Sequence, residues 1–152
     1  RRSSDLELDA LTGGEESGGF GFRGHIPERD GILSSLYLLD ALVRTGATAS
    51  GLLADLYAMV GQYEYDRLDL EFPAEQRAQI LERVESAQPR NFAGIDVTAT
   101  SSTDGYRYDL DDGSWLLVRF SGTEPLLRVY AEASTMAHVQ RLIGAGRALT
   151  GV

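Results

Sequence analysis

The chain has 152 residues, 43% of them hydrophobic, so it can bury the core of one medium domain. Its net charge of −9 argues against nucleic acid as a partner, because binding to a phosphate backbone requires clustered Lys and Arg. The absence of cysteine excludes disulfides and thiolate metal sites. No apolar run reaches the roughly 18 residues of a membrane span, and no signal peptide is recognisable, so we expect a cytoplasmic protein without a membrane partner.

Residues 1–60 are predicted to contain a strand, a glycine-rich loop and two helices. The strand is expected at 9–12 and the loop at 13–22. Asp30 is predicted to cap the first helix, because its carboxylate can accept the free amides of a first turn. Apolar residues then recur at helical spacing: Ile32, Leu36, Leu39 and Val43.

A second helix is expected after the first one ends at Gly46. It is predicted to begin near Thr48 or Ser50 and to stop at Gly61. Its apolar face comprises Leu52, Leu56, Met59 and Val60. One short strand and two amphipathic helices cannot cover one another's apolar faces, so this part is predicted to be the end of a larger α/β domain.

Residues 61–72 are expected to link this part to a compact α+β domain at 73–152. Within the link, 63–72 has the alternation of a strand. Pro73 suits the first turn of a helix, and Gln88-Pro89 closes that helix. A last helix is capped by Ser134 or Thr135. Four strands are predicted between the two helices, at 94–100, 105–110, 115–120 and 126–133.

The stretch RFSGTEP separates the last two of these strands. Ser121, Gly122 and Thr123 can direct successive amides and hydroxyls into one concavity, which is a nest for an anion. Arg119 precedes the turn and Arg128 follows it, so both guanidinium groups can reach the same phosphate. A phosphate-binding turn is one interpretation of this pattern.

A second candidate site is the acidic loop GGEESGG. Glu15 and Ser17 offer acceptors and a donor for sugar hydroxyls, and the flanking glycines allow a ligand to approach the backbone. The next stretch, FGFRGHIPERD, adds Arg23, His25 and Arg29 within a short span.

Both candidate sites also have a purely structural interpretation. The turn can be a tight connection whose arginine pairs with Glu124 or Glu132. The acidic loop can be a solvated turn, and His25 can be a structural histidine. Composition and spacing alone do not decide between the two interpretations.

GGEESGG, HIPERDGI and RFSGTEPLLRVYAEA, in this order, resemble the signatures of the α-D-phosphohexomutases, the phosphoglucomutase and phosphomannomutase enzymes. The resemblance covers nearly the whole chain. It implies that 1–60 is the end of the family's third domain, which is α/β. It also implies that 73–152 is the fourth domain, an α+β fold like that of TATA-box-binding proteins, with a four-stranded antiparallel sheet between helices.

The resemblance implies roles for matching positions. Glu15 and Ser17 would bind sugar hydroxyls, and Arg29 would lie near the substrate. The phosphate that is not transferred would be bound by Arg119, Ser121, Gly122, Thr123 and Arg128. Relatives that use mannose or glucosamine phosphates often have His after the second glycine of the acidic loop. This chain has Gly19 there, which favours glucose phosphates.

The family's phosphoserine loop and its Mg²⁺-binding loop do not occur in this sequence. The resemblance therefore places both in upstream domains of the same enzyme. It implies a hexose phosphate substrate, phosphoryl transfer from a phosphoserine, and a reorienting bisphosphate such as glucose 1,6-bisphosphate. With no catalytic residue or metal ligand of its own, the 152-residue chain is predicted to be inactive alone. A phosphomannomutase, a dual-specificity mutase and a non-catalytic module that binds phosphosugars are the competing hypotheses.

Overall fold

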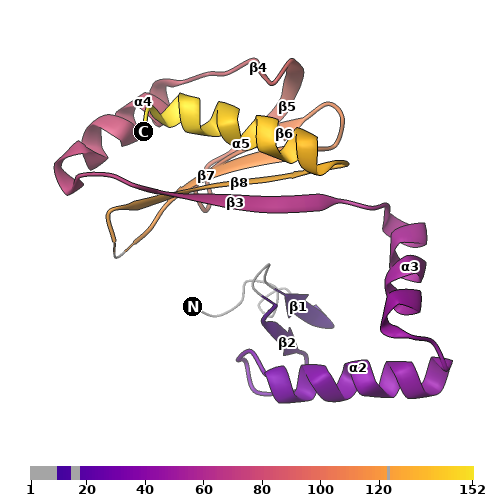
Figure 1. The fold of residues 1–152 in the computed structure, drawn as a ribbon. Coiled ribbons are helices and arrows are strands. Elements are labelled where there is room, and N and C mark those ends of the chain that lie inside the picture. The colour runs from indigo at the N-terminus through magenta and orange to yellow at the C-terminus, as the bar shows by residue number, and fades with distance from the viewer. Residues whose placement is uncertain (1–9, 15–17, 123) are drawn as a thin grey trace. The chain divides into compact units, whose positions relative to one another are not determined.

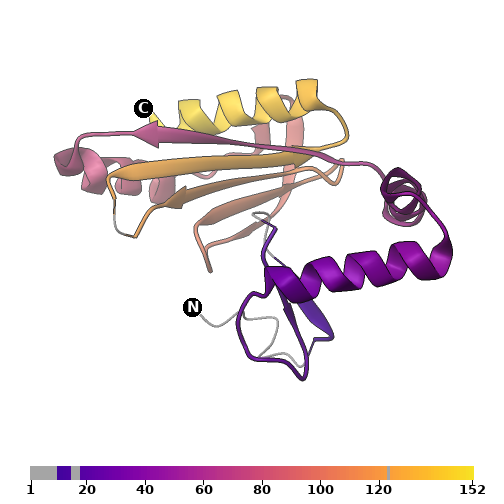
Figure 2. The ribbon, with the colours of Figure 1, turned by 60° about the horizontal axis from the view of Figure 1, so that its bottom comes forward.

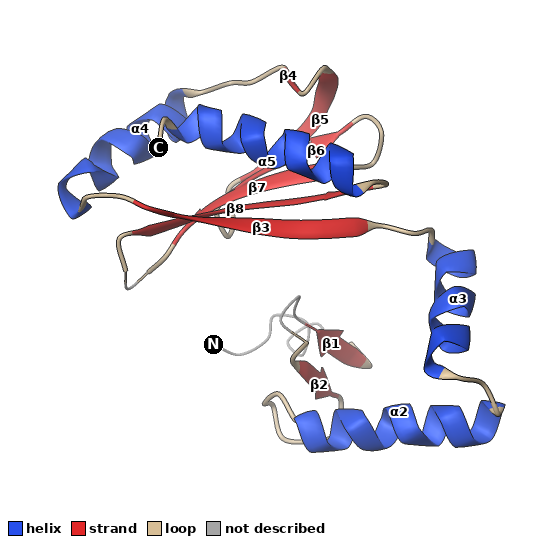
Figure 3. Ribbon diagram, in the orientation of Figure 1, coloured by secondary structure: helices blue, strands red, loops and turns tan. Residues whose placement is uncertain are grey.

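The structure is a computed structural model that describes residues 10–14, 18–122 and 124–152. It divides into two compact units, residues 1–61 and 62–152, whose helices and strands are distinguished in Figure 3. Three predicted site residues, Glu15, Ser17 and Thr123, lie outside the described residues.

The first unit begins with a two-stranded hairpin. Strand β1 (Thr12–Gly14) pairs antiparallel with β2 (Phe20–Phe22) (Figure 1), so the acidic loop connects two paired strands. The strand expected at 9–12 overlaps β1 only at Thr12.

Helices α2 (Gly31–Thr45) and α3 (Ala49–Val60) follow, and both begin at predicted caps. Asp30 Oδ1 accepts a hydrogen bond from Leu33 N at 2.9 Å, and Thr48 Oγ1 accepts one from Gly51 N at 3.1 Å. Neither helix contains a buried residue, and the most exposed apolar side chains are Ile32, Val43 and Met59. This unit leaves uncovered the kind of apolar surface that an α/β domain buries against its sheet. No helix in the described part of the chain is both long and apolar enough to cross a membrane.

The second unit is an antiparallel sheet with helices on one face. Its strands are β3 (Glu64–Glu71), β4 (Asn91–Phe92), β5 (Ile95–Ser101), β6 (Tyr106–Leu110), β7 (Trp115–Phe120) and β8 (Leu126–Ala133). Their order in the sheet is β3-β8-β7-β6-β5-β4. Helices α4 (Arg77–Ser86) and α5 (Met136–Thr150) pack together, and α5 runs along β8, β3 and β7 (Figures 1 and 2).

Alternation along the strands separates a buried face from an open face. On β7, Leu116 and Val118 point to the helices and are completely buried. Their cross-strand partners Ala131 and Val129 are equally buried. The intervening residues of β7 and β8 therefore lie on the open face, where Arg119 is the cross-strand partner of Arg128.

The strand predicted at 63–72, within the segment expected to link the two parts, is β3 and belongs to this sheet. β3 pairs with β8 from Glu64↔Ala133 to Glu71↔Leu126, so the compact unit begins at residue 62 rather than at 73. Alternation in 63–72 predicts a strand, but its partner lies about sixty residues later, and local sequence does not identify such a partner.

Two further elements differ from expectation. Pro73 is followed by a 3₁₀ turn, η1 (Ala74–Gln76), before α4 begins. The sheet also gains β4, so it has six strands rather than four. The β4–β5 hairpin turns at Ala93 and Gly94, whose φ angles are 51° and 87°. Non-glycine residues are uncommon at positive φ, so Ala93 is not a residue from which a turn is predicted.

Candidate functional site

The RFSGTEP turn is closed by its own backbone. Ser121 N donates to Leu126 O at 2.8 Å, and Leu126 N donates to Glu124 O at 2.8 Å. Ser121 Oγ accepts from Glu124 N at 3.3 Å, and this serine is 9% exposed. Three backbone amides, those of Ser121, Glu124 and Leu126, are therefore used inside the turn, and the Ser121 hydroxyl helps to shape it.

Gly122 is the described residue of the turn whose amide stays available. No hydrogen bond joins its N–H to another described residue. A methyl group added at Gly122 would meet nothing within 4 Å, so the backbone here is open to a ligand. A phosphate oxygen could approach this amide directly.

Arg119 and Arg128 lie directly opposite each other on the open face beside the turn. Each forms an ion pair with a carboxylate that belongs to neither β7 nor β8. Arg119 Nε lies 3.4 Å from Asp104 Oδ1, and Arg128 Nε lies 3.8 Å from Asp69 Oδ2. Arg128 Nε is buried and makes no hydrogen bond to the described residues. Like charges directly across a strand pair are destabilising, and an anion between them would relieve the repulsion.

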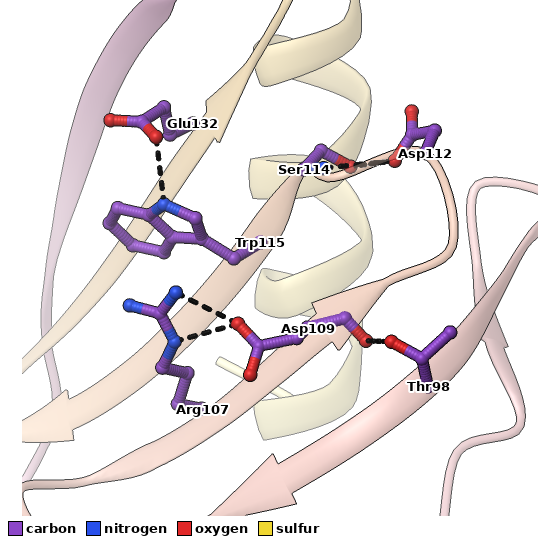
Figure 4. A network of polar contacts seen from close by, with 7 residues as sticks. All are labelled: Thr98, Arg107, Asp109, Asp112, Ser114, Trp115 and Glu132. Carbon is purple, nitrogen blue, oxygen red and sulfur yellow. Dashed lines mark hydrogen bonds and ion pairs between the residues drawn. The ribbon is translucent and has the colours of Figure 1, made fainter. Parts of the chain in front are cut away.

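The structural interpretation of the turn predicted that Arg119 pairs with Glu124 or Glu132, but the structure shows a different partner. Asp104 is the carboxylate beside Arg119. Glu132 Oε1 instead accepts from Trp115 Nε1 at 3.0 Å, because the two residues are cross-strand partners (Figure 4).

Arg107 also lies on the open face, where it contacts residues outside the turn. Arg107 binds Asp109 through Nε and Nη2, each at 2.8 Å, and its guanidinium lies 4.7 Å from the centre of the Trp115 ring (Figure 4). Arg107 is the cross-strand partner of Leu117, which precedes Arg119 by two residues, so it lies farther from the turn. It is therefore a suitable arginine with which to compare Arg119.

One residue of the turn's surroundings was not predicted from the sequence. Arg77 Nη1, from the first turn of α4, donates to Ser121 O at 3.1 Å. Its guanidinium also lies 5.1 Å from the centre of the Phe120 ring. Arg77 lines a shallow hollow together with Gly122, so a third arginine adjoins the turn.

In the first unit, β1 and β2 hold the ends of the acidic loop that contains Glu15 and Ser17. A methyl group added at Gly14 would lie 2.6 Å from Phe20 Cε1. Gly18 has a φ of 85°, which side chains rarely adopt. A side chain at Gly14 would require the exposed Phe20 ring to shift, and one at Gly18 would be strained, whatever the loop binds.

Arg29 lies against this loop at Gly19. A methyl group added at Gly19 would lie 2.4 Å from Arg29 Cδ, so the Arg29 side chain occupies the space that a side chain at 19 would need. Asp30 N donates to Phe20 O at 3.0 Å, which fixes this segment beside the start of β2.

His25 and Asp30 fasten the segment that precedes α2. His25 Nε2 lies 2.8 Å from Asp30 Oδ2, while the other carboxylate oxygen caps α2. The hydrogen bond from Leu33 N, followed by that from His25, holds the pKa of Asp30 below its usual value. His25 thus has a structural role, which is one of the two interpretations that the sequence left open.

The described residues contain no group of three or more His, Cys, Asp or Glu side chains that could hold a metal ion. The resemblance places the Mg²⁺ ligands in upstream domains, so this finding does not bear on the metal of the whole enzyme.

Two domain models cover most of the chain. "Phosphoglucomutase/phosphomannomutase, alpha/beta/alpha domain III" matches residues 4–60, and "Phosphoglucomutase/phosphomannomutase, C-terminal domain" matches residues 71–145. An α/β part followed by an α+β part is thus the arrangement of a known class of phosphosugar enzymes. The chain belongs to the phosphohexomutase family and corresponds to its C-terminal part.

Individual relatives agree with this assignment. The chain is 36% identical over 129 residues to a probable phosphoglucosamine mutase of Methanothermobacter thermautotrophicus, covering 85% of this chain and 27% of the relative. It is 31% identical over 130 residues to a phosphoglucomutase/phosphomannomutase of Thermococcus kodakarensis, covering 86% and 26%. The chain therefore spans about a quarter of the length of these curated relatives.

Solved structures match along almost the whole chain. A putative phosphomannomutase from Thermus thermophilus has a TM-score of 0.73 and 31% identity, covering 99% of this chain and 29% of that one. A phosphoglucomutase/phosphomannomutase family protein from Burkholderia thailandensis has a TM-score of 0.70 at 20% identity, covering 97% and 29%, and supports the fold alone.

Proposed function

We propose that this chain is the C-terminal part of an enzyme that interconverts hexose 1-phosphates and hexose 6-phosphates. In this proposal the second unit binds the phosphate that is not being transferred, and the first unit binds sugar hydroxyls. The observation that carries it is the pair Arg119 and Arg128, which face each other beside a turn whose Gly122 amide is open.

The chemistry assigned to this chain is binding rather than bond breaking. Transfer from a phosphoserine gives a sugar bisphosphate, which must reorient before its other phosphate can be transferred to the serine. Arg119 and Arg128 can accept either phosphate, since a guanidinium recognises the oxygens and not the carbon that carries them. Glu15, Ser17 and Arg29 would hold the sugar in both orientations.

The phosphoserine, Mg²⁺ and the upstream domains belong to the same proposal. Glucose 1,6-bisphosphate is the expected intermediate and activator. Phosphoryl transfer without the serine would lack its nucleophile. The 152-residue chain should therefore show no turnover, whereas the whole enzyme should be active.

Glucose phosphates are proposed as the first substrates, because Gly19 stands where relatives for other sugars often carry histidine. Glucosamine phosphates are the second candidate, since several relatives are named phosphoglucosamine mutases. The remaining candidates are mannose phosphates, dual use of glucose and mannose, and a non-catalytic phosphosugar module.

A coupled assay of the whole enzyme with the 1-phosphates of glucose, mannose and glucosamine tests the proposal. We expect the largest kcat/KM with glucose 1-phosphate. A preference for another hexose would correct the substrate but keep the reaction. Absence of turnover with all three, in a folded enzyme that carries its phosphoserine, would reject the mutase in favour of the binding module.

A further inference from the structure

We infer that Arg77 is a positioning residue of the phosphate-binding turn, because its bond to the Ser121 carbonyl aims the Gly122 amide at the bound phosphate. The inference rests on the proposed function and adds a residue that neither the motif nor the resemblance assigns.

The first step is the contact itself. Arg77 Nη1 donates to Ser121 O at 3.1 Å, across a separation of 44 residues in sequence. The guanidinium lies 5.1 Å from the centre of the Phe120 ring, so stacking holds the same group in place. Two independent contacts therefore fix where the Ser121 carbonyl points.

The second step is the side from which Arg77 approaches. Phe120 packs against the core beneath the helices, and its cross-strand partner Leu127 is completely buried. Arg77 therefore reaches the turn from the helix-covered face. Arg119 precedes Phe120 on β7 and belongs to the opposite, open face.

The third step follows from the peptide bond. The group that joins Ser121 to Gly122 is planar and trans, so its C=O and N–H point in opposite directions. Holding the carbonyl toward Arg77 turns the Gly122 N–H away from the helices. Arg119 and Arg128 belong to the face opposite the helices, so this orientation suits an anion bound between the turn and the two arginines.

The turn offers few other amides for this task. Ser121 N and Glu124 N are both used within the turn. Among the described residues of the turn, the Gly122 amide is thus the donor left for an anion. Phosphate binding therefore depends on the direction in which this N–H points. Loss of one charge-assisted hydrogen bond of about 1.5–3 kcal/mol corresponds to a weakening of phosphate binding by about tenfold or more.

The test compares three substitutions in the whole enzyme. Arg77→Met keeps much of the side-chain stem but removes the donor, and Arg77→Lys keeps a donor and the charge. Arg83→Met is the matched control, because Arg83 lies on the same helix and also donates through Nη1 to a backbone carbonyl, that of Thr150 at 3.3 Å. Thermal stability is measured for each variant.

Two measurements are made on each variant. The first is a titration with inorganic phosphate, followed through the Gly122 amide in enzyme labelled with ¹⁵N-glycine and assigned with Gly122→Ala. The second is the steady-state kinetics of the mutase reaction. For Arg77→Met we expect a displaced Gly122 resonance, phosphate binding weakened about tenfold and a similar rise in KM, with kcat changed much less.

For Arg77→Lys we expect partial recovery, and for Arg83→Met phosphate binding and KM like those of the wild type. If phosphate shifts Gly122 in the wild type and Arg77→Met binds it equally well, Arg77 is only structural and this inference is overturned while the proposed function stands. If phosphate leaves Gly122 of the wild-type enzyme unmoved, the phosphate site itself is wrong, and the inference falls with it.

Discussion

Helix α5 carries two glycines that differ in what lies beside them. A methyl group added at Gly146 would lie 2.6 Å from Val129 Cγ1 and 2.9 Å from Leu116 Cδ1, whereas one at Gly144 would meet nothing within 4 Å. Val129 and Leu116 are completely buried, so neither can move aside into solvent. Replacing glycine by alanine within a helix is worth about 0.8–1 kcal/mol, and overpacking a core costs about 1–3 kcal/mol. Gly144→Ala should therefore stabilise the protein, and Gly146→Ala should be about 1–3 kcal/mol less stable than Gly144→Ala.

Urea unfolding followed by the fluorescence of Trp115 measures this difference. Trp115 is the only tryptophan of the chain and lies on β7, so its signal reports on the second unit. With a urea dependence of about 1–3 kcal/mol per M, the two midpoints should differ by roughly 1 M. Equal midpoints would mean that α5 does not pack against β7 and β8 as closely as the structure indicates.

Three further predictions concern titration and substrate binding. Burial, followed by the hydrogen bond to Glu85, raises the pKa of Tyr106 to about 12. The stability from this shift is present below pH 10 and lost as the pH rises through 12, so Tyr106→Phe should remove one tyrosine ionisation near pH 12 from an ultraviolet titration. The pKa of Asp30 is lowered, so the stability that its carboxylate contributes is present above its ordinary pKa and is lost as the pH falls through its pKa in the folded protein. Asp30→Asn should therefore flatten the dependence of stability on pH on the acid side. An unchanged dependence would argue against the cap. Glu15→Ala in the whole enzyme should lower kcat/KM equally in both directions, while wild-type kinetics would make the acidic loop a solvated turn.

Features that depend on neighbouring residues were predictable from the sequence. Asp30 and Thr48 cap α2 and α3 because the free amides of a first turn lie within three residues of the capping side chain. Thr135 caps α5 for the same reason. The β-branched and aromatic content of 126–133 likewise predicts the bounds of β8.

Features that depend on distant contacts were not predictable. The pairing of β3 with β8 joins segments about sixty residues apart, so local sequence predicts a strand at 63–72 but not its partner in the sheet. Arg77 shows nothing unusual in its own helix, and its contact with the turn exists only once the start of α4 lies beside Ser121, 44 residues later in the sequence. The carboxylate near Arg119 is that of Asp104, which follows β5. The sequence suggested Glu124 or Glu132, because these two residues are closer to Arg119 along the chain.

Kinetics of Arg119→Ala in the whole enzyme test the central claim most directly, with Arg107→Ala as the matched control. Both arginines lie on the open face beside an aspartate, but Arg107 is held by Asp109 and Trp115, away from the turn. A surface ion pair contributes about 0–1 kcal/mol to stability, so neither variant should melt at a much lower temperature. Arg119→Ala should lower kcat/KM at least tenfold, equivalent to about 1.4 kcal/mol of transition-state binding, and Arg107→Ala should change it little. Wild-type efficiency for Arg119→Ala, or an equal loss for Arg107→Ala, would contradict the assignment of this turn as the phosphate site.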